Sequence, residues 1–173
     1  MILIGIGANL PSARFGTPVQ TVEAALTALD AHHDVRVLRR SRWFESAPVP
    51  MSDQPWYVNG ACSVLTELNA QRLLEVLHDI EADFGRVRAE KNAARVLDLD
   101  LLAYDDFVSG ESAGFNVPHP RLHERAFVLL PLRDVAPGWT HPGMGGSLEA
   151  LIAALPSDQV ARPMEPTHVA HSA

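Results

Sequence analysis

The sequence predicts an α+β fold, a ferredoxin-like β-α-β-β-α-β antiparallel sheet with helices on one face and C-terminal additions. Three observations favour it. Short β-branched apolar runs alternate with two amphipathic segments in this order, turn residues separate them, and 173 residues with 47% hydrophobic content suffice for one core. We therefore expect a single domain over 1–155. The last residues, 156–173, hold three prolines and little apolar material, so we expect a disordered tail.

The first half of the chain predicts a strand, a helix and two further strands. Residues 2–6 (ILIGI) form a buried apolar run that ends in a turn-like Gly-Ala-Asn-Leu sequence. Thr17 opens a capping-box pattern with proline at the first helical position, and apolar residues at helical spacing extend the helix over 18–31. Residues 35–44 and 57–66 are rich in β-branched and aromatic residues, which predicts two strands.

The second half continues the pattern and then departs from it. Asn69 can cap a helix over 70–84, whose leucine, isoleucine and phenylalanine side chains recur on one stripe. Residues 96–104 are predicted to form a fourth strand. An apolar segment over 126–136 and a short helix over 147–155 make up the C-terminal additions.

Composition and charge exclude several functional classes. The net charge of −7 argues against a general nucleic-acid binder. No run approaches 18 consecutive apolar residues, and the N-terminus lacks the basic lead-in and cleavage site of a secretory signal. The single cysteine, Cys62, cannot form an internal disulfide, so a reducing, cytoplasmic location is expected, with no membrane and no nucleic-acid partner.

The segment 95–101 (RVLDLDL) carries the strongest chemical signal. On a strand, its leucines share one face and suit packing under helices, whereas Asp98 and Asp100 share the other face, about 7 Å apart along the backbone. Two such carboxylates repel each other unless a positive group lies between them. Magnesium with nucleotide phosphates would satisfy them. The alternative is a solvent-facing strand with polar residues turned outward.

Basic residues gather in three places in this acidic chain, and thirteen of the 14 are arginine. Arginine binds phosphate oxygens two at a time, so clusters suggest anion recognition. The group over 36–42 fits the outer face of a strand better than an anion-binding site. The second group lies just before the two aspartates and consists of Arg86, Arg88, Lys91 and Arg95. The third consists of His119, Arg121 and Arg125. Its histidine lies between two prolines, which suits either a phosphate contact or a plain turn.

Two further pairs of side chains lie at spacings that place them on one face of an element. Tyr57 and Asn59 share one strand face, and an aromatic ring beside a carboxamide is a pairing that recognises a flat heterocycle. His78 and Glu81 share one edge of the second helix. A histidine and a glutamate near a helix end are more often solvated than functional, and position alone does not select them.

Seven short motifs follow one another along the sequence. They are Gly7-Ala8-Asn9-Leu10, Ser46-Ala47-Pro48-Val49, Asp53-Gln54-Pro55-Trp56-Tyr57-Val58-Asn59, Ile80-Glu81 with Gly85-Arg86-Val87-Arg88, Arg95-Val96-Leu97-Asp98-Leu99-Asp100, Pro118-His119-Pro120-Arg121 and Arg125-Ala126-Phe127-Val128-Leu129. In this order and spacing, from Ile4 to about Leu155, the chain resembles the 6-hydroxymethyl-7,8-dihydropterin pyrophosphokinases of folate biosynthesis.

The resemblance implies transfer of a pyrophosphoryl group from ATP to the hydroxymethyl oxygen of 6-hydroxymethyl-7,8-dihydropterin, with release of AMP. It implies that Asp98 and Asp100 hold two Mg²⁺ ions, and that Arg86 and Arg95 are catalytic. The pterin-binding residues that it implies are Ser46, Val49, Tyr57, Asn59 and Phe127. The ATP-binding residues that it implies are His78, Arg88, His119 and Arg125, with Glu81 as a supporting or nucleotide-side residue on the helix of His78. We expect the enzyme to be a monomer.

Two alternatives stay open at this point. A nucleotidyltransferase or cyclase also places paired aspartates on a strand of a ferredoxin-like fold, but it acts at the α-phosphate and needs no pterin site. A regulatory module of the same fold could bind a nucleotide without turnover. Magnesium-independent nucleotide binding would favour that module, because it has no need of metal carboxylates.

Overall fold

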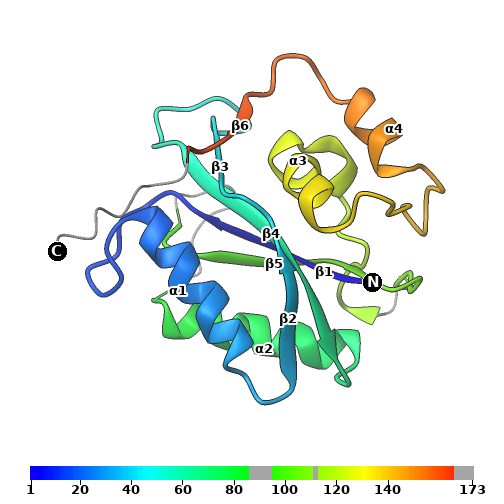
Figure 1. Ribbon diagram of the computed structural model, residues 1–173, viewed down its shortest axis with the longest axis horizontal. Helices are drawn as coiled ribbons and strands as arrows, with labels where there is room; N and C mark the ends of the chain where they lie inside the picture. The colour runs from blue at the N-terminus through cyan, green and yellow to red at the C-terminus, as the bar shows by residue number, and fades with distance from the viewer. Residues whose placement is uncertain (86–94, 111–112, 166–173) are drawn as a thin grey trace, which may run out of the picture.

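A six-stranded antiparallel sheet forms the centre of the computed structural model, which describes residues 1–85, 95–110 and 113–165 (Figure 1). The strands are β1 Ile2–Ala8, β2 Val35–Arg40, β3 Phe44–Ser46, β4 Tyr57–Thr66, β5 Asp98–Tyr104 and β6 Ala161–Pro163. The helices are α1 Pro18–Asp30, α2 Ala70–Asp83, α3 Ala126–Val135 and α4 Leu148–Ala153, with a 3-10 turn over Leu122–Glu124.

The strand order confirms the predicted ferredoxin-like sheet. The order is β5-β1-β4-β3-β6, and β2 also pairs with β4, so the four strands of the β-α-β-β-α-β core lie as in that fold. The register aligns residues far apart in sequence. Gly7 of β1 lies opposite Asn59 of β4 on one side and opposite Asp98 of β5 on the other. One row across three strands thus carries a carboxamide, a glycine and a carboxylate.

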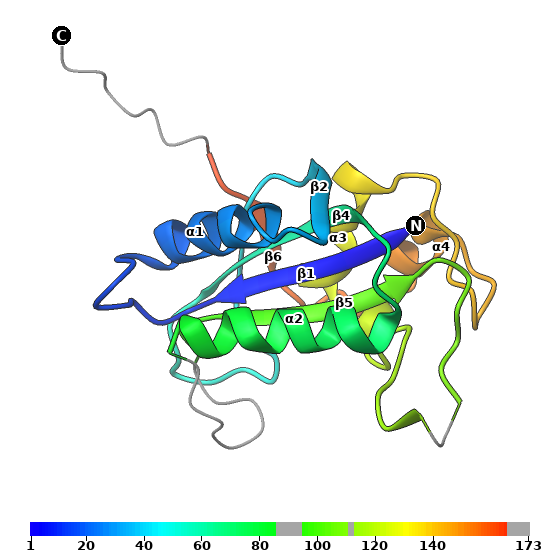
Figure 2. The ribbon, with the colours of Figure 1, turned by 90° about the horizontal axis from the view of Figure 1, so that it is seen from below.

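Helices cover both faces of the sheet. The helices α1 and α2 pack on the first face, where the leucines of 97–101 are buried as predicted (Figure 2). The helices α3 and α4 bury a second apolar cluster, which includes Leu3, Leu102 and Leu129, on the opposite face. The two predicted helices do share a face; the C-terminal additions supply the second layer because their own apolar stripes need a partner surface.

The predicted helix starts are confirmed. Thr17 Oγ1 accepts the N–H of Gln20 at 3.3 Å, and Gln20 Oε1 accepts the N–H of Thr17 at 2.9 Å, which completes the capping box. Asn69 Oδ1 accepts the N–H of Arg72 at 2.9 Å at the start of α2. Gly85 ends that helix region with a φ of 84°, a conformation that glycine adopts without steric cost.

Two predictions from the sequence need correction. The predicted strand over 35–44 is two strands, because the buried Ser41 interrupts it: its Oγ accepts the N–H of Ala61 at 2.9 Å, and the pairing of β2 with β4 shifts register just before it. The prediction of a disordered tail over 156–173 is wrong for the part that the structure describes. Residues 161–163 form β6, which pairs with β3 and extends the sheet. Residues 166–173 lie outside the described residues.

No described helix combines the length and the apolar character needed to cross a membrane.

Candidate active site

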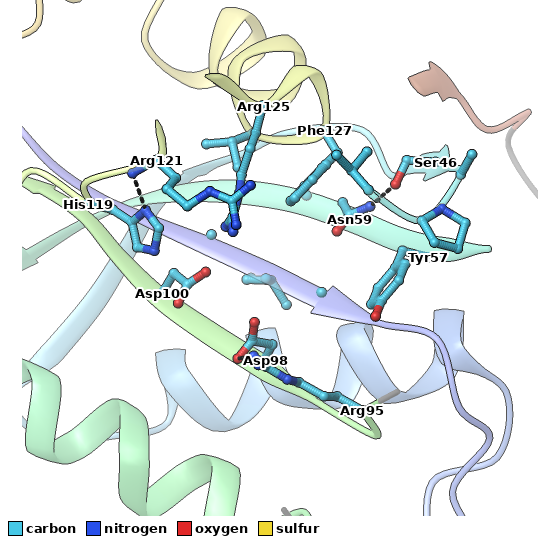
Figure 3. Close-up of a pocket in the computed structure, with 18 of the residues that line it drawn as sticks. Ser46, Tyr57, Asn59, Arg95, Asp98, Asp100, His119, Arg121, Arg125 and Phe127 are labelled. Carbon is cyan, nitrogen blue, oxygen red and sulfur yellow. Dashed lines mark hydrogen bonds and ion pairs between the residues drawn. The ribbon is translucent and has the colours of Figure 1, made fainter. Parts of the chain in front are cut away.

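A pocket of about 400 Å³ opens on the sheet face that carries α3 (Figure 3). Its floor is the β5-β1-β4 part of the sheet, where Gly5 and Gly7 of β1 place no side chain in the way. The start of α3 forms one wall, and the loop after β3, residues 47–54, contributes to another. The pocket therefore joins segments from most of the chain's length.

Asp98 and Asp100 point from β5 into this pocket (Figure 3). Their direction confirms the prediction from strand alternation, since the leucines between and beside them are buried on the helical face. Asp98 Oδ1 lies 2.7 Å from a guanidinium nitrogen of Arg95. Burial, and then the charge of Asp98, raise the pKa of Asp100 from its ordinary 3.8 to about 7. A cation between the two carboxylates would relieve this repulsion.

Three arginines and a histidine also line the pocket: Arg95, Arg121, Arg125 and His119. Burial lowers the pKa of Arg95, but the charges of the two aspartates outweigh burial and raise it. Burial, followed by the charge of Arg121, lowers the pKa of Arg125. Like-charged guanidinium groups are thus held together in a partly dry site, which favours binding of a polyanion.

His119 is neutral at physiological pH. Burial and the charge of Arg125 lower its pKa to about 4. Its Nδ1 accepts the N–H of Arg121 at 3.2 Å, so the ring proton of the neutral imidazole resides on Nε2. The imidazole can therefore offer one N–H donor to a ligand without adding a charge.

Tyr57, Phe127 and Asn59 gather at the other end of the pocket (Figure 3). Asn59 is 5% exposed, and its Nδ2 donates to Ser46 Oγ at 2.7 Å, which fixes the orientation of the carboxamide. Phe127 lies on the first turn of α3, with the Arg125 guanidinium 5.4 Å from its ring centre. Aromatic rings beside a fixed amide suit a flat heterocycle with ring donors and acceptors. Val49, predicted from the sequence, lines this region as well.

Asn9 connects the two ends of the pocket, and sequence reasoning treated it only as part of a turn. It is 1% exposed; its Oδ1 accepts the N–H of Arg95 at 2.8 Å, and its Nδ2 donates to Gln54 Oε1 at 3.2 Å. Gln54 Oε1 also accepts the hydroxyl of Tyr57 at 3.1 Å. The link joins positions 9, 54, 57 and 95, and no local pattern predicts contacts at such separations.

Glu81 departs from the sequence interpretation of a solvated side chain. It is 2% exposed, and its Oε1 accepts the N–H of Leu99 at 2.6 Å. That amide lies between the two pocket aspartates on the edge strand β5. Glu81 thus holds the strand that carries them.

One predicted site residue, His78, does not line the described pocket, and two others lie outside the described residues. His78 is exposed on α2 and is not among the described residues that line the pocket, so its ATP contact stays a prediction. Arg86 and Arg88 lie outside the described residues. A separate cluster, His32, His33 and Asp34, lies on the turn between α1 and β2 and lines no part of this pocket.

Comparison with known proteins gives a consistent result. A family model described as 7,8-dihydro-6-hydroxymethylpterin-pyrophosphokinase matches residues 3–137. A Synechocystis protein named 2-amino-4-hydroxy-6-hydroxymethyldihydropteridine pyrophosphokinase is 36% identical over 150 residues, 87% of this chain and 73% of that protein. A Pseudomonas aeruginosa protein of the same name is 35% identical over 161 residues, 93% of this chain and 95% of its own.

Solved structures show the same fold. A crystal structure of wild-type Plasmodium falciparum HPPK-DHPS superposes with a TM-score of 0.65 at 13% identity, over 88% of this chain. This chain spans 44% of that longer one. At such low identity the likeness concerns the fold alone.

Proposed function

The chain belongs to the 7,8-dihydro-6-hydroxymethylpterin-pyrophosphokinase family, and we propose that the pocket on the α3 face is where the pyrophosphoryl group passes from ATP to the pterin. The family predicted from the motifs is thereby confirmed: the chain is a pyrophosphokinase of folate biosynthesis, an ATP-dependent diphosphotransferase. One observation carries the placement. A single pocket holds a carboxylate pair, three arginines and two aromatic rings beside a fixed carboxamide.

Asp98 and Asp100 fit magnesium. Both are hard oxygen donors that point into one pocket, and burial, followed by the charge of Asp98, raises the pKa of Asp100, so a cation would favour its ionised form. We propose that they hold two ions, as the sequence resemblance implies. When bound, magnesium would neutralise phosphate charge and make the hydroxymethyl group more acidic.

The arginines do the remaining work at the phosphate end. Transfer of this kind leaves little covalent chemistry to the protein, so positioning and charge neutralisation dominate. Arg95 is fixed through its backbone N–H by Asn9 and through its side chain by Asp98, which suits it to hold the group in transfer. Arg125 and the Nε2–H of His119 face the same space and are proposed to bind ATP phosphates.

The aromatic end is proposed to bind the pterin. Tyr57 and Phe127 would enclose the flat ring, and Asn59 would read its edge. Because Ser46 Oγ takes one N–H of that amide, the Asn59 carboxamide is presented in one orientation and can distinguish donors from acceptors on the ring. The backbone groups of Ser46 and Val49 would complete the edge. We further propose a cytoplasmic monomer.

The test is product identification. The protein is incubated with ATP, magnesium and 6-hydroxymethyl-7,8-dihydropterin, and nucleotides are separated by chromatography beside an Asp98→Ala, Asp100→Ala double variant. AMP that forms only with the pterin, and only in the wild type, supports both transfer and the metal assignment. ADP would indicate simple phosphorylation instead. Magnesium-independent ATP binding without turnover would favour a regulatory module.

A further inference from the structure

The C-terminal segment over 159–164, here called the C-terminal clamp, touches both walls of the pterin end of the pocket. It follows α4, passes the start of α3 and then pairs with β3 as strand β6 (Figure 1). None of its residues lines the pocket among those described. Any influence on the substrates must therefore act through the residues that it holds.

Gln159 secures the α3 wall. The side chain of Arg125, the N-cap residue of α3, makes no capping hydrogen bond, so the helix start lacks a local cap. Gln159 supplies one from a distance: its Oε1 accepts the N–H of Ala126 at 2.8 Å, and its Nε2 donates to the carbonyl of Glu124 at 2.6 Å. These two bonds bracket Arg125 and fix the turn that presents Phe127 to the pocket (Figure 3).

The rest of the clamp contacts the end of β3 and the start of the loop 47–54, which contributes to another wall. The carbonyl of Val160 accepts the N–H of Ala47 at 3.1 Å, and β6 pairs Ala161 with Ser46, the residue that orients Asn59. Figure 3 shows β6 directly beyond Ser46. Arg162 donates to Glu45 and lies 5.5 Å from the Trp56 ring. One short segment therefore links the start of α3, which carries Phe127, to Ser46 and Ala47 beside Asn59.

We propose that Gln159 is a positioning residue for the pterin: it holds the first turn of α3 so that Phe127 faces Tyr57 across the pterin end of the pocket. The proposal rests on the placement of the pterin between these two rings. A cap that served only folding would change the stability of α3 and leave pterin affinity alone. A positioning role changes pterin affinity, and does so through Phe127.

The test compares Gln159→Met with a matched cap variant. Methionine keeps the length and bulk of the side chain but removes both hydrogen bonds. Ser147→Ala removes the cap of the neighbouring helix α4, whose Ser147 Oγ accepts the N–H of Ala150 at 3.2 Å and lines no part of the pocket. Both variants should lower the melting temperature. Only Q159M should raise the dissociation constant for 6-hydroxymethyl-7,8-dihydropterin, by about fivefold.

A double-variant cycle with Phe127→Ala identifies the route. If Gln159 acts through Phe127, Q159M adds less than twofold to the dissociation constant of the F127A protein. Equal effects of Q159M in both backgrounds, or an effect no larger than that of S147A, would overturn the proposal. F127A alone tests the pterin placement separately: an unchanged affinity there would refute that placement, and with it the route from Gln159 through Phe127. Should Q159M fold poorly, Gln159→Glu serves in its place: it keeps the acceptor for the N–H of Ala126 but sets a carboxylate oxygen against the carbonyl of Glu124.

Discussion

Replacing Asp100 by asparagine should stabilise the metal-free protein while it lowers the rate at least about a hundredfold. The substitution keeps the side-chain shape and removes one of two neighbouring carboxylates in the pocket. The pKa of Asp100 is raised from 3.8 to about 7, first by burial and then by Asp98, so the ionised form is disfavoured in the folded protein. The same group that destabilises the fold is the one proposed to bind magnesium.

The magnitude follows from this pKa difference. At a pH above 7, where Asp100 is ionised in both states, the difference corresponds to roughly 4 kcal/mol of lost folding free energy. The pocket is open to water, which screens the charge, so we expect about half of that, ~2 kcal/mol. For a chain of this length that is a rise in melting temperature of about 4–8 °C. Loss of a metal ligand should raise the activation barrier by at least ~3 kcal/mol, about a hundredfold in rate.

The sign of the pH dependence is fixed by the raised pKa. A carboxyl with a raised folded pKa binds its proton more tightly in the folded state, so its unfavourable contribution is absent below pH 3.8 and complete above pH 7. The stability gain of Asp100→Asn should therefore be largest at pH 8 in EDTA and should fade toward pH 4. Thermal melts across this range measure it, and AMP formation measures activity.

A matched control has the opposite expectation. Asp134 is also partly covered, but hydrogen bonds from Arg42 lower its pKa, at 2.9 Å from both Nε and Nη2. Asp134→Asn should lower the melting temperature at pH 8 and leave turnover unchanged. If Asp100→Asn behaved like this control, or stabilised the protein equally at pH 4 and pH 8, the account of the aspartate pair would be refuted.

Three further predictions follow from other contacts. His119→Asn should remove part of the acid sensitivity of the fold. The pKa of His119 is lowered to about 4 in the folded protein, so the free energy of unfolding falls by at most about 3 kcal/mol as pH drops from 6.5 to 4. Denaturant melts at pH 7 and pH 4.5 would show whether the variant loses less stability than the wild type. Gly60→Ala should cost about 1–3 kcal/mol of unfolding free energy in urea melts, since its new Cβ would lie 2.4 Å from the Trp43 ring; an unchanged midpoint would contradict this. Asn59→Ala should raise the dissociation constant for the pterin at least about tenfold and that for ATP less than twofold, measured by fluorescence titration, with Ser46→Ala giving a smaller change in the same direction.

The parts of the fold that the sequence predicted are those set by local physics. The capping box at Thr17 and the cap at Asn69 depend on residues three apart. The directions of Asp98 and Asp100 depend only on the two-residue period of a strand. The split of 35–44 was missed because Ser41 is an acceptable strand residue by type, and its interrupting hydrogen bond goes to Ala61 on another strand.

The sequence by itself thus determined the order of elements, the two faces of β5 and, through the ordered motifs, the family. Tertiary structure alone decided how the site is held. Asn9 links Arg95 to the Tyr57 loop, and Glu81 holds the amide between the two aspartates. Gln159 caps a helix that begins 33 positions earlier. The raised pKa of Asp100 likewise requires burial by distant segments. Such contacts depend on which surfaces meet after folding, and no local period or propensity encodes them.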